Sequence, residues 1–182
     1  MSVQQLADAS ANGDADTVRR LLAEDASLAQ RYTEEGWSAL HLAARLEIAA
    51  MLLDAGADIN ARNRHKFAGP GNSPLSAAVY QQRHEVIRLL IERGADVNQG
   101  DNAGWTPLHL AAASGYVESA RLLLDAGANL NARTGDSGGQ RWGKKTAIEL
   151  LSDSERIRDD GTPVPPEADA AIRSLLHEHG AS

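Results

Sequence analysis

The sequence predicts an all-α repeat solenoid of about five stacked helix pairs. Three observations lead to this fold class. An apolar helix end followed by a glycine turn occurs three times, and a block that begins with glycine and contains an Ala-Leu-rich helix start precedes each copy. The distance from Gly94 to Gly127 is 33 residues, which is the length of one helix-turn-helix unit. The three copies of the helix end are Met51–Asn60, Leu89–Asn98 and Leu122–Asn131.

The first helix of each repeat has a recognisable start. Ser38, Ser73 and Thr106 stand just before helical patterns, where a hydroxyl can accept from the free amides of the first turn. Pro74 and Pro107 follow at the first helical position, where the missing N–H costs nothing. We therefore expect a helix to begin at each of these places, with a second helix after it.

The second helix of each repeat ends at a glycine. Gly56, Gly94 and Gly127 fall one or two residues beyond the apolar pattern, where a left-handed cap suits glycine. The 33-residue period and the Thr-Pro-Leu-His block at 106–109 resemble the ankyrin repeat. This resemblance implies short β-hairpin fingers between helix pairs. It divides the 182 residues of a single domain into an N-terminal cap, three inner repeats and a C-terminal cap, at 1–33, 34–66, 67–99, 100–133 and 134–182.

Both ends read as capping units. Helices are expected over 3–11 and 16–24, with Arg19 and Arg20 on a solvated side of the second helix. At the other end we expect helices over 146–157 and 168–178, joined by a proline-rich link.

The repeat pattern is broken in the fingers and in one turn. Insertions lengthen the fingers around 62–70 and 135–145. Between Ala44 and Glu47 about three residues are missing that the third repeat supplies as Gly115–Val117. Either an unusually tight turn or a shifted helix boundary can absorb this loss, and a shortened first helix is the simplest interpretation.

Composition excludes several function classes. The net charge of −7 disfavours general attraction to nucleic acid or an anionic membrane. The apolar runs are too short to cross a bilayer, the start lacks the features of a secretory signal, and we expect a cytoplasmic protein. With no cysteine, thiol chemistry and thiolate metal sites are unavailable.

No catalytic, cofactor or metal motif stands out, so we expect a non-catalytic protein. The glycines at 135–143 lack the strand and the ending of a phosphate loop. His177 and His179 point to different faces of a helix and make a poor metal pair. The resemblance implies that His41 and His109 bond the hydroxyl at the helix start and neighbouring backbone, a structural role.

The fingers concentrate aromatic and basic residues, which are typical anchors of protein interfaces. We therefore predict binding of another protein through the concave face and the fingers, with an acidic patch on the partner and a monomeric free state. A dedicated inhibitor or immunity role and nucleic-acid binding through the basic fingers stay open, as does simple packing of a tryptophan between fingers. The predicted contact residues are Trp37, Arg45, His65, Lys66, Phe67, Tyr80, Trp105, Arg141 and Trp142.

Overall fold

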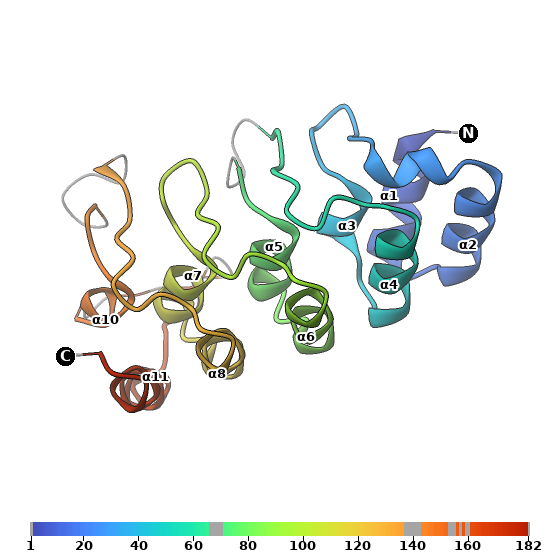
Figure 1. Cartoon of the computed structure of the whole chain (residues 1–182). Coiled ribbons are helices and arrows are strands. Elements are labelled where there is room, and N and C mark those ends of the chain that lie inside the picture. Colours follow the sequence, from blue (N-terminus) through green and yellow to red (C-terminus); the bar gives the residue numbers. More distant parts are fainter. Residues whose placement is uncertain are drawn as a thin grey trace. The chain divides into compact units, whose positions relative to one another are not determined.

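In the computed structural model the chain forms two compact units, 1–96 and 97–182. Figure 1 shows the helices in their order along the chain. The described residues are all except 1, 66–70, 137–142, 153–155, 157, 159–160 and 182. Their secondary structure is helical, in antiparallel pairs, which confirms the predicted fold class. No helix in the described part is long and apolar enough to pass through a membrane.

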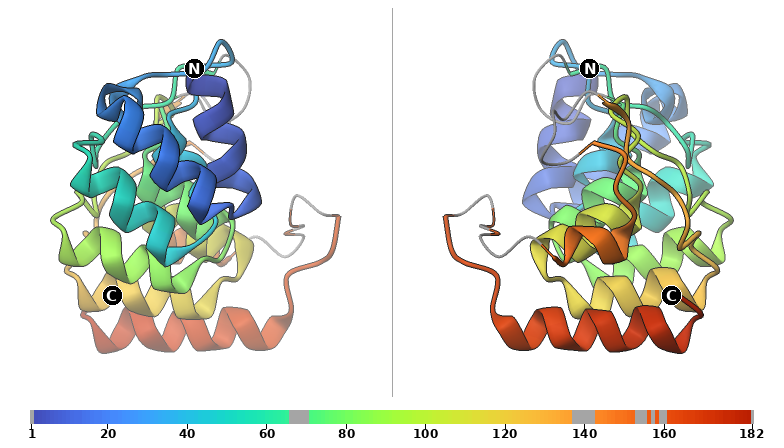
Figure 2. Two further views of the ribbon diagram at one scale, coloured as in Figure 1. Left: turned by 90° about the vertical axis from the view of Figure 1, so that its right-hand side faces the viewer. Right: turned by 90° about the vertical axis from the view of Figure 1, so that its left-hand side faces the viewer.

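The first unit packs its helices in two rows. α1, α3 and α5 contact one another in sequence, and α2, α4 and α6 do the same beside them (Figure 2). Alanine and leucine fill the core between the rows, as expected for closely packed helices. The elements are α1 (Val3–Asn12), α2 (Ala15–Glu24), the 3-10 helix η1 (Ala26–Gln30), α3 (Ala39–Leu42), α4 (Leu46–Asp54), α5 (Pro74–Tyr80) and α6 (His84–Glu92).

The second unit also packs its helices against one another in pairs. α10 packs on α7, and α11 runs along α8 (Figure 2, red and yellow). The fully buried Leu108, Leu123 and Leu150 belong to three of these helices. The elements are α7 (Pro107–Ser114), α8 (Val117–Asp125), α10 (Ala147–Leu150) and α11 (Pro166–Glu178).

The helix starts agree with the expected capping. Ser73 accepts from the Ser76 amide at 3.2 Å, and Thr106 accepts from the His109 amide at 3.4 Å. Ser38 is also the N-cap of its helix, but its hydroxyl bonds the His41 ring and makes no bond to a helix amide. Gly56, Gly94 and Gly127 have the left-handed backbone that the sequence predicts.

Backbone hydrogen bonds close the bases of the fingers. The Thr33 amide donates to Trp37 O at 2.9 Å, and the Asn63 amide donates to Asn72 O at 2.9 Å. An isolated bridge joins Tyr32 and Ser38. In the described residues these fingers therefore have hairpin pairing but no strand of regular length.

The missing residues near Ala44 shorten α3, as the simplest interpretation predicts. α3 has 4 residues, whereas α7 has 8. Arg83, from the next helix pair, donates to the carbonyls of Leu42 and Ala43 at 3.0 and 2.7 Å. The arginine thus satisfies carbonyls that a longer helix would have bonded internally.

The predicted helix over 146–157 is wrong in its length, because α10 ends at Leu150. The buried Arg156 donates to Ala112 O of α7 and forms an ion pair with Asp169. Arg158 donates to Ser114 O at 3.0 Å. These bonds satisfy carbonyl groups at the end of α7. If α10 continued straight, the same carbonyl groups would lack these hydrogen bonds.

Candidate protein-binding surface

A buried histidine connects the start of α3 to the neighbouring finger. His41 lies 2.7 Å from the Ser38 hydroxyl through Nδ1 and 2.9 Å from Asn72 O through Nε2. Because a carbonyl can only accept, Nε2 carries the proton and Nδ1 accepts from Ser38. Burial lowers the pKa of His41 to about 4, so the ring is neutral at pH 7. The predicted structural role therefore agrees with this geometry.

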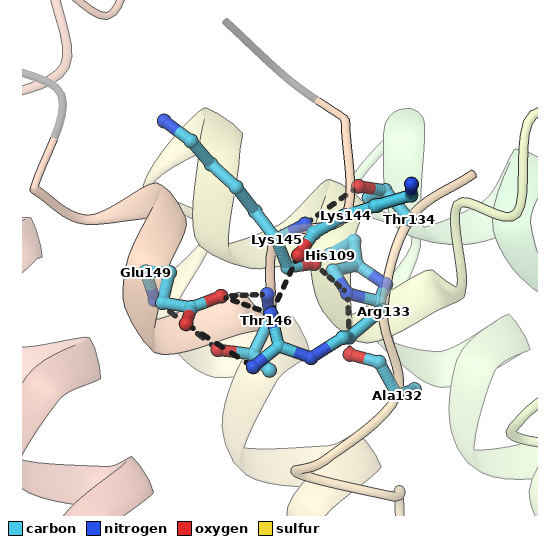
Figure 3. Close-up of polar contacts among 8 residues, drawn as sticks. All are labelled: His109, Ala132, Arg133, Thr134, Lys144, Lys145, Thr146 and Glu149. Atoms are coloured by element: carbon cyan, nitrogen blue, oxygen red, sulfur yellow. Dashed lines mark hydrogen bonds and ion pairs between the residues drawn. The ribbon is translucent and has the colours of Figure 1, made fainter. Parts of the chain in front are cut away.

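His109 repeats the arrangement in the second unit (Figure 3). Its Nδ1 lies 2.8 Å from the Thr106 hydroxyl, and its Nε2 lies 3.0 Å from Ala132 O and 3.1 Å from Lys145 O. Burial lowers the pKa of His109 as well. A single ring thus holds both sides of the finger that carries the second insertion.

Glu149 takes the place of this histidine in the last repeat, and Figure 3 shows a charged network around it. The Thr146 amide donates to Glu149 Oε2 at 2.7 Å, and Arg133 Nη1 lies 2.9 Å from the same oxygen. Arg133 also donates to Lys144 O at 2.6 Å. The bond from the Thr146 backbone, followed by the contacts with Arg133, lowers the pKa of Glu149.

The Thr146 cap is expected to contribute measurably to the second unit. Thr146→Ala removes the hydroxyl that accepts from the Glu149 amide at 3.4 Å and lowers the free energy of unfolding by about 1 kcal/mol. Urea unfolding followed by circular dichroism measures the loss. Ser174→Ala on the exposed side of α11 serves as the control and should change stability by much less. An equal loss in both variants would contradict the capping role.

The two described tryptophans stand partly buried against histidines. The Trp37 ring lies 5.7 Å from His41 at 70° and 5.6 Å from His65 at 32°. Trp105 lies 6.2 Å from His109 at 62°. Each indole therefore packs on the scaffold, as the packing alternative for these residues anticipates, and each tryptophan as a residue is intermediate in exposure.

Several basic side chains of the fingers are already engaged. The Arg64 guanidinium lies 4.0 Å from the centre of the Tyr32 ring, a cation–π contact that joins two fingers. Lys144 lies 2.9 Å from the carboxylate of Asp136. Of these two side chains, Lys144 has its charge offset by a carboxylate, whereas Arg64 keeps its positive charge. Sequence reasoning missed Tyr32, although an aromatic residue in a finger was the signal that identified the tryptophans.

The structure does not gather all predicted contact residues. Trp37 and His65 lie together, but Arg45 follows α3 at its opposite end, with its side chain beside Gly13. Tyr80 is 45% exposed at the end of α5. Lys66, Phe67, Arg141 and Trp142 fall outside the described residues. Among the residues that the structure describes, no cluster of acidic and histidine side chains could hold a metal ion.

Paired helices, glycine-capped turns and histidine-anchored fingers define a helical-repeat protein. The chain belongs to the ankyrin-repeat family, whose repeat pattern matches residues 5–63 and 64–134. Ankyrin repeats are generally protein–protein interaction modules and are typically non-catalytic.

Known relatives match this chain over part of their length. Human protein phosphatase 1 regulatory subunit 27 is 46% identical over 66 residues, which cover 36% of this chain and 43% of the relative. The E3 ubiquitin-protein ligase XB3 of Oryza sativa subsp. japonica is 31% identical over 176 residues, or 69% of this chain and 38% of the relative. Protein PhlB of Serratia liquefaciens is 46% identical over 81 residues, or 43% and 34%. This chain spans less than half the length of each of the three relatives.

Proposed function

We propose that this protein binds another protein through its fingers and the adjacent ends of its first helices. The observation that carries the proposal is the position of Trp37, which contacts the rings of His41 and His65 and is only partly buried as a residue. Packing on two rings fixes the indole before a partner arrives, so little conformational entropy remains to be lost on binding. Tryptophan is also among the residues that most often anchor interfaces.

The proposed partner has an acidic surface patch. Arg62 and Arg64 are exposed in the same finger as His65, in a protein whose net charge is −7. Complementary charge on a partner would speed association and orient it toward this side. One relative is named as a regulatory subunit of a phosphatase, a description that fits a role exerted through another protein.

A comparison of finger variants tests this proposal. Wild type and Trp37→Ala/Trp105→Ala are immobilised and exposed to lysate of the source organism, and retained proteins are identified by mass spectrometry. Glu92→Ala, an exposed change on α6, is the matched control. Circular dichroism first establishes that each variant is folded. We expect a protein retained by wild type and control but reduced at least tenfold with the double variant.

Other outcomes would reject the proposal or narrow it. Equal retention by all three proteins would place binding elsewhere on the surface. Capture of nucleic acid alone, with a steep fall as salt rises, would favour the basic fingers as a nucleic-acid site. If one partner alone is retained and its activity is blocked, the role narrows to that of a dedicated inhibitor or immunity protein.

A further inference from the structure

The shortened α3 leaves a cavity on the first unit. It has a volume of about 530 Å³ and lies between the turn before α4 and the turn before α6, with Ala44–Glu47 on one side and Arg83–Val86 on the other. We call it the turn cavity. The turn at Ala44 is held in place because its amide donates to Ser10 O at 3.0 Å. Since Trp37 precedes α3 and Arg45 follows it, the cavity lies at the opposite end of that helix from the finger residues.

Two arginines of the turn cavity lack a carboxylate partner within the described part of the chain. Arg83 donates to the carbonyls of Leu42 and Ala43, so it binds no acidic side chain through these contacts. Arg45 is exposed, with its side chain resting beside Gly13. Each arginine immediately precedes a helix, and neither side chain caps that helix. Both positive charges therefore remain uncompensated by an ion pair.

The acidic residues of the cavity offset these charges only in part. Glu47 Oε1 lies 2.6 Å from Nη2 of Arg19, which does not line the cavity. The negative charge of Glu47 is therefore already paired. Glu85 is exposed in the first turn of α6, and His84 beside it is half-buried. Among the described residues that line the cavity, Arg45 and Arg83 have no carboxylate partner, and Glu85 is the one carboxylate without a basic partner. The lining therefore has a local excess of positive charge in a protein of net charge −7.

The cavity also offers apolar surface. Leu46 is 42% exposed, and with Tyr80 it is one of two large hydrophobic residues exposed in the described part of the chain. Ala44 and the buried Val86 lie around the same cavity. An apolar side chain can therefore be buried here next to the arginines.

We propose that the turn cavity is a second docking site, which takes an acidic residue adjacent to an apolar residue in an extended segment of a partner protein. The acidic group is attracted by Arg45 and Arg83, and the apolar side chain covers Leu46. This inference rests on the proposed protein-binding function, but it assigns binding to a different face from the fingers.

A nuclear magnetic resonance titration tests the site with defined probes. The ¹⁵N-labelled full chain is titrated with acetylated, amidated hexapeptides that have a fixed Leu-Glu core and uncharged flanking positions. A pool with a Leu-Lys core is the charge-reversed control. We expect saturable shifts concentrated in the amides of 44–47 and 83–86 with the Leu-Glu pool, and none there with the Leu-Lys pool.

Matched variants separate this site from the fingers. Arg45→Glu should weaken binding about tenfold or more, because it replaces an attraction with a repulsion. Arg20→Glu makes the same charge change on α2 and should leave the affinity within about twofold. Insertion of Ala-Ser-Gly after Ala44, which restores the length found at 113–115, should fill the cavity and abolish binding.

The result does not depend on finding the partner of the fingers. Trp37→Ala should retain the peptide shifts, so failure of the lysate experiment and failure here are distinguishable. Equal shifts with both pools, shifts confined to the fingers, or no saturable shift at millimolar peptide would each overturn the proposal.

Discussion

Gly36→Ala should lower the free energy of unfolding of the first unit by roughly 3 kcal/mol. Gly36 has φ of 90°, and an added Cβ would lie 2.6 Å from the backbone carbon of Arg64 and 2.8 Å from the backbone nitrogen of His65. The Gly36 carbonyl also accepts from the Arg64 amide at 2.8 Å. The methyl group would therefore strain its own backbone and push two neighbouring fingers apart.

Gly94→Ala is the matched control within the same unit. Gly94 has φ of 87°, but nothing lies within 4 Å of an added Cβ. The control keeps the backbone strain and removes the clash, so we expect a loss of about 1 kcal/mol. Urea unfolding of both variants, followed by circular dichroism, measures the difference. Equal losses would show that close approach of the fingers adds nothing to the cost at Gly36.

Acidification from pH 6.5 to pH 4 should lower the free energy of unfolding on the order of 3 kcal/mol through His41 alone. The pKa of His41 falls from 6.5 to about 4 in the folded protein because the ring is buried. Between these values the unfolded chain binds a proton that the folded chain does not. Stability is therefore complete above pH 6.5 and is lost as the pH falls toward 4.

Comparison with His41→Gln isolates this contribution. The variant cannot titrate at this position, so its stability should depend less on pH between 6.5 and 4, and His109 and Glu149 contribute to the slope that remains. A hydrogen bond from Thr17 lowers the pKa of Asp14 from 3.8, so that group acts at still lower pH. Urea unfolding at intervals of half a pH unit gives both curves. Parallel curves would refute the assignment to His41.

Local sequence signals predicted the helices of this protein well. Hydroxyl N-caps and prolines gave the starts of α5 and α7, and glycines gave the left-handed turns after α4, α6 and α8. These features can be predicted from the sequence because each depends on a few adjacent residues. The short α3 was also foreseen, since a deletion must shorten either a helix or its turn.

Features that depend on contacts between distant residues were not predictable. α10 ends early because Arg156 reaches the α7 carbonyl of Ala112, a partner 44 positions away in the sequence. The 3-10 helix η1 was not predicted either, because no part of the repeated sequence pattern indicates it. Arg45 and Trp37 were assigned to one surface, yet the structure puts them at opposite ends of α3. Residue types identified candidates for binding, but only the fold could assign them to separate faces.

Backbone hydrogen bonds at the two ends of the second insertion close the finger at its base. The Thr134 amide donates to Lys145 O at 3.0 Å, the Lys144 amide returns to Thr134 O at 3.1 Å, and Gly135 is tied to Ala103 O at 2.7 Å. His109 holds the same base from beneath. Once such a base is fixed, each doubling of the enclosed chain length costs only about 0.6 kcal/mol in closure entropy. New residues can therefore accumulate between Asp136 and Gly143 while the helices keep their stability, which gives evolution, or an engineer, one place to change recognition without rebuilding the scaffold.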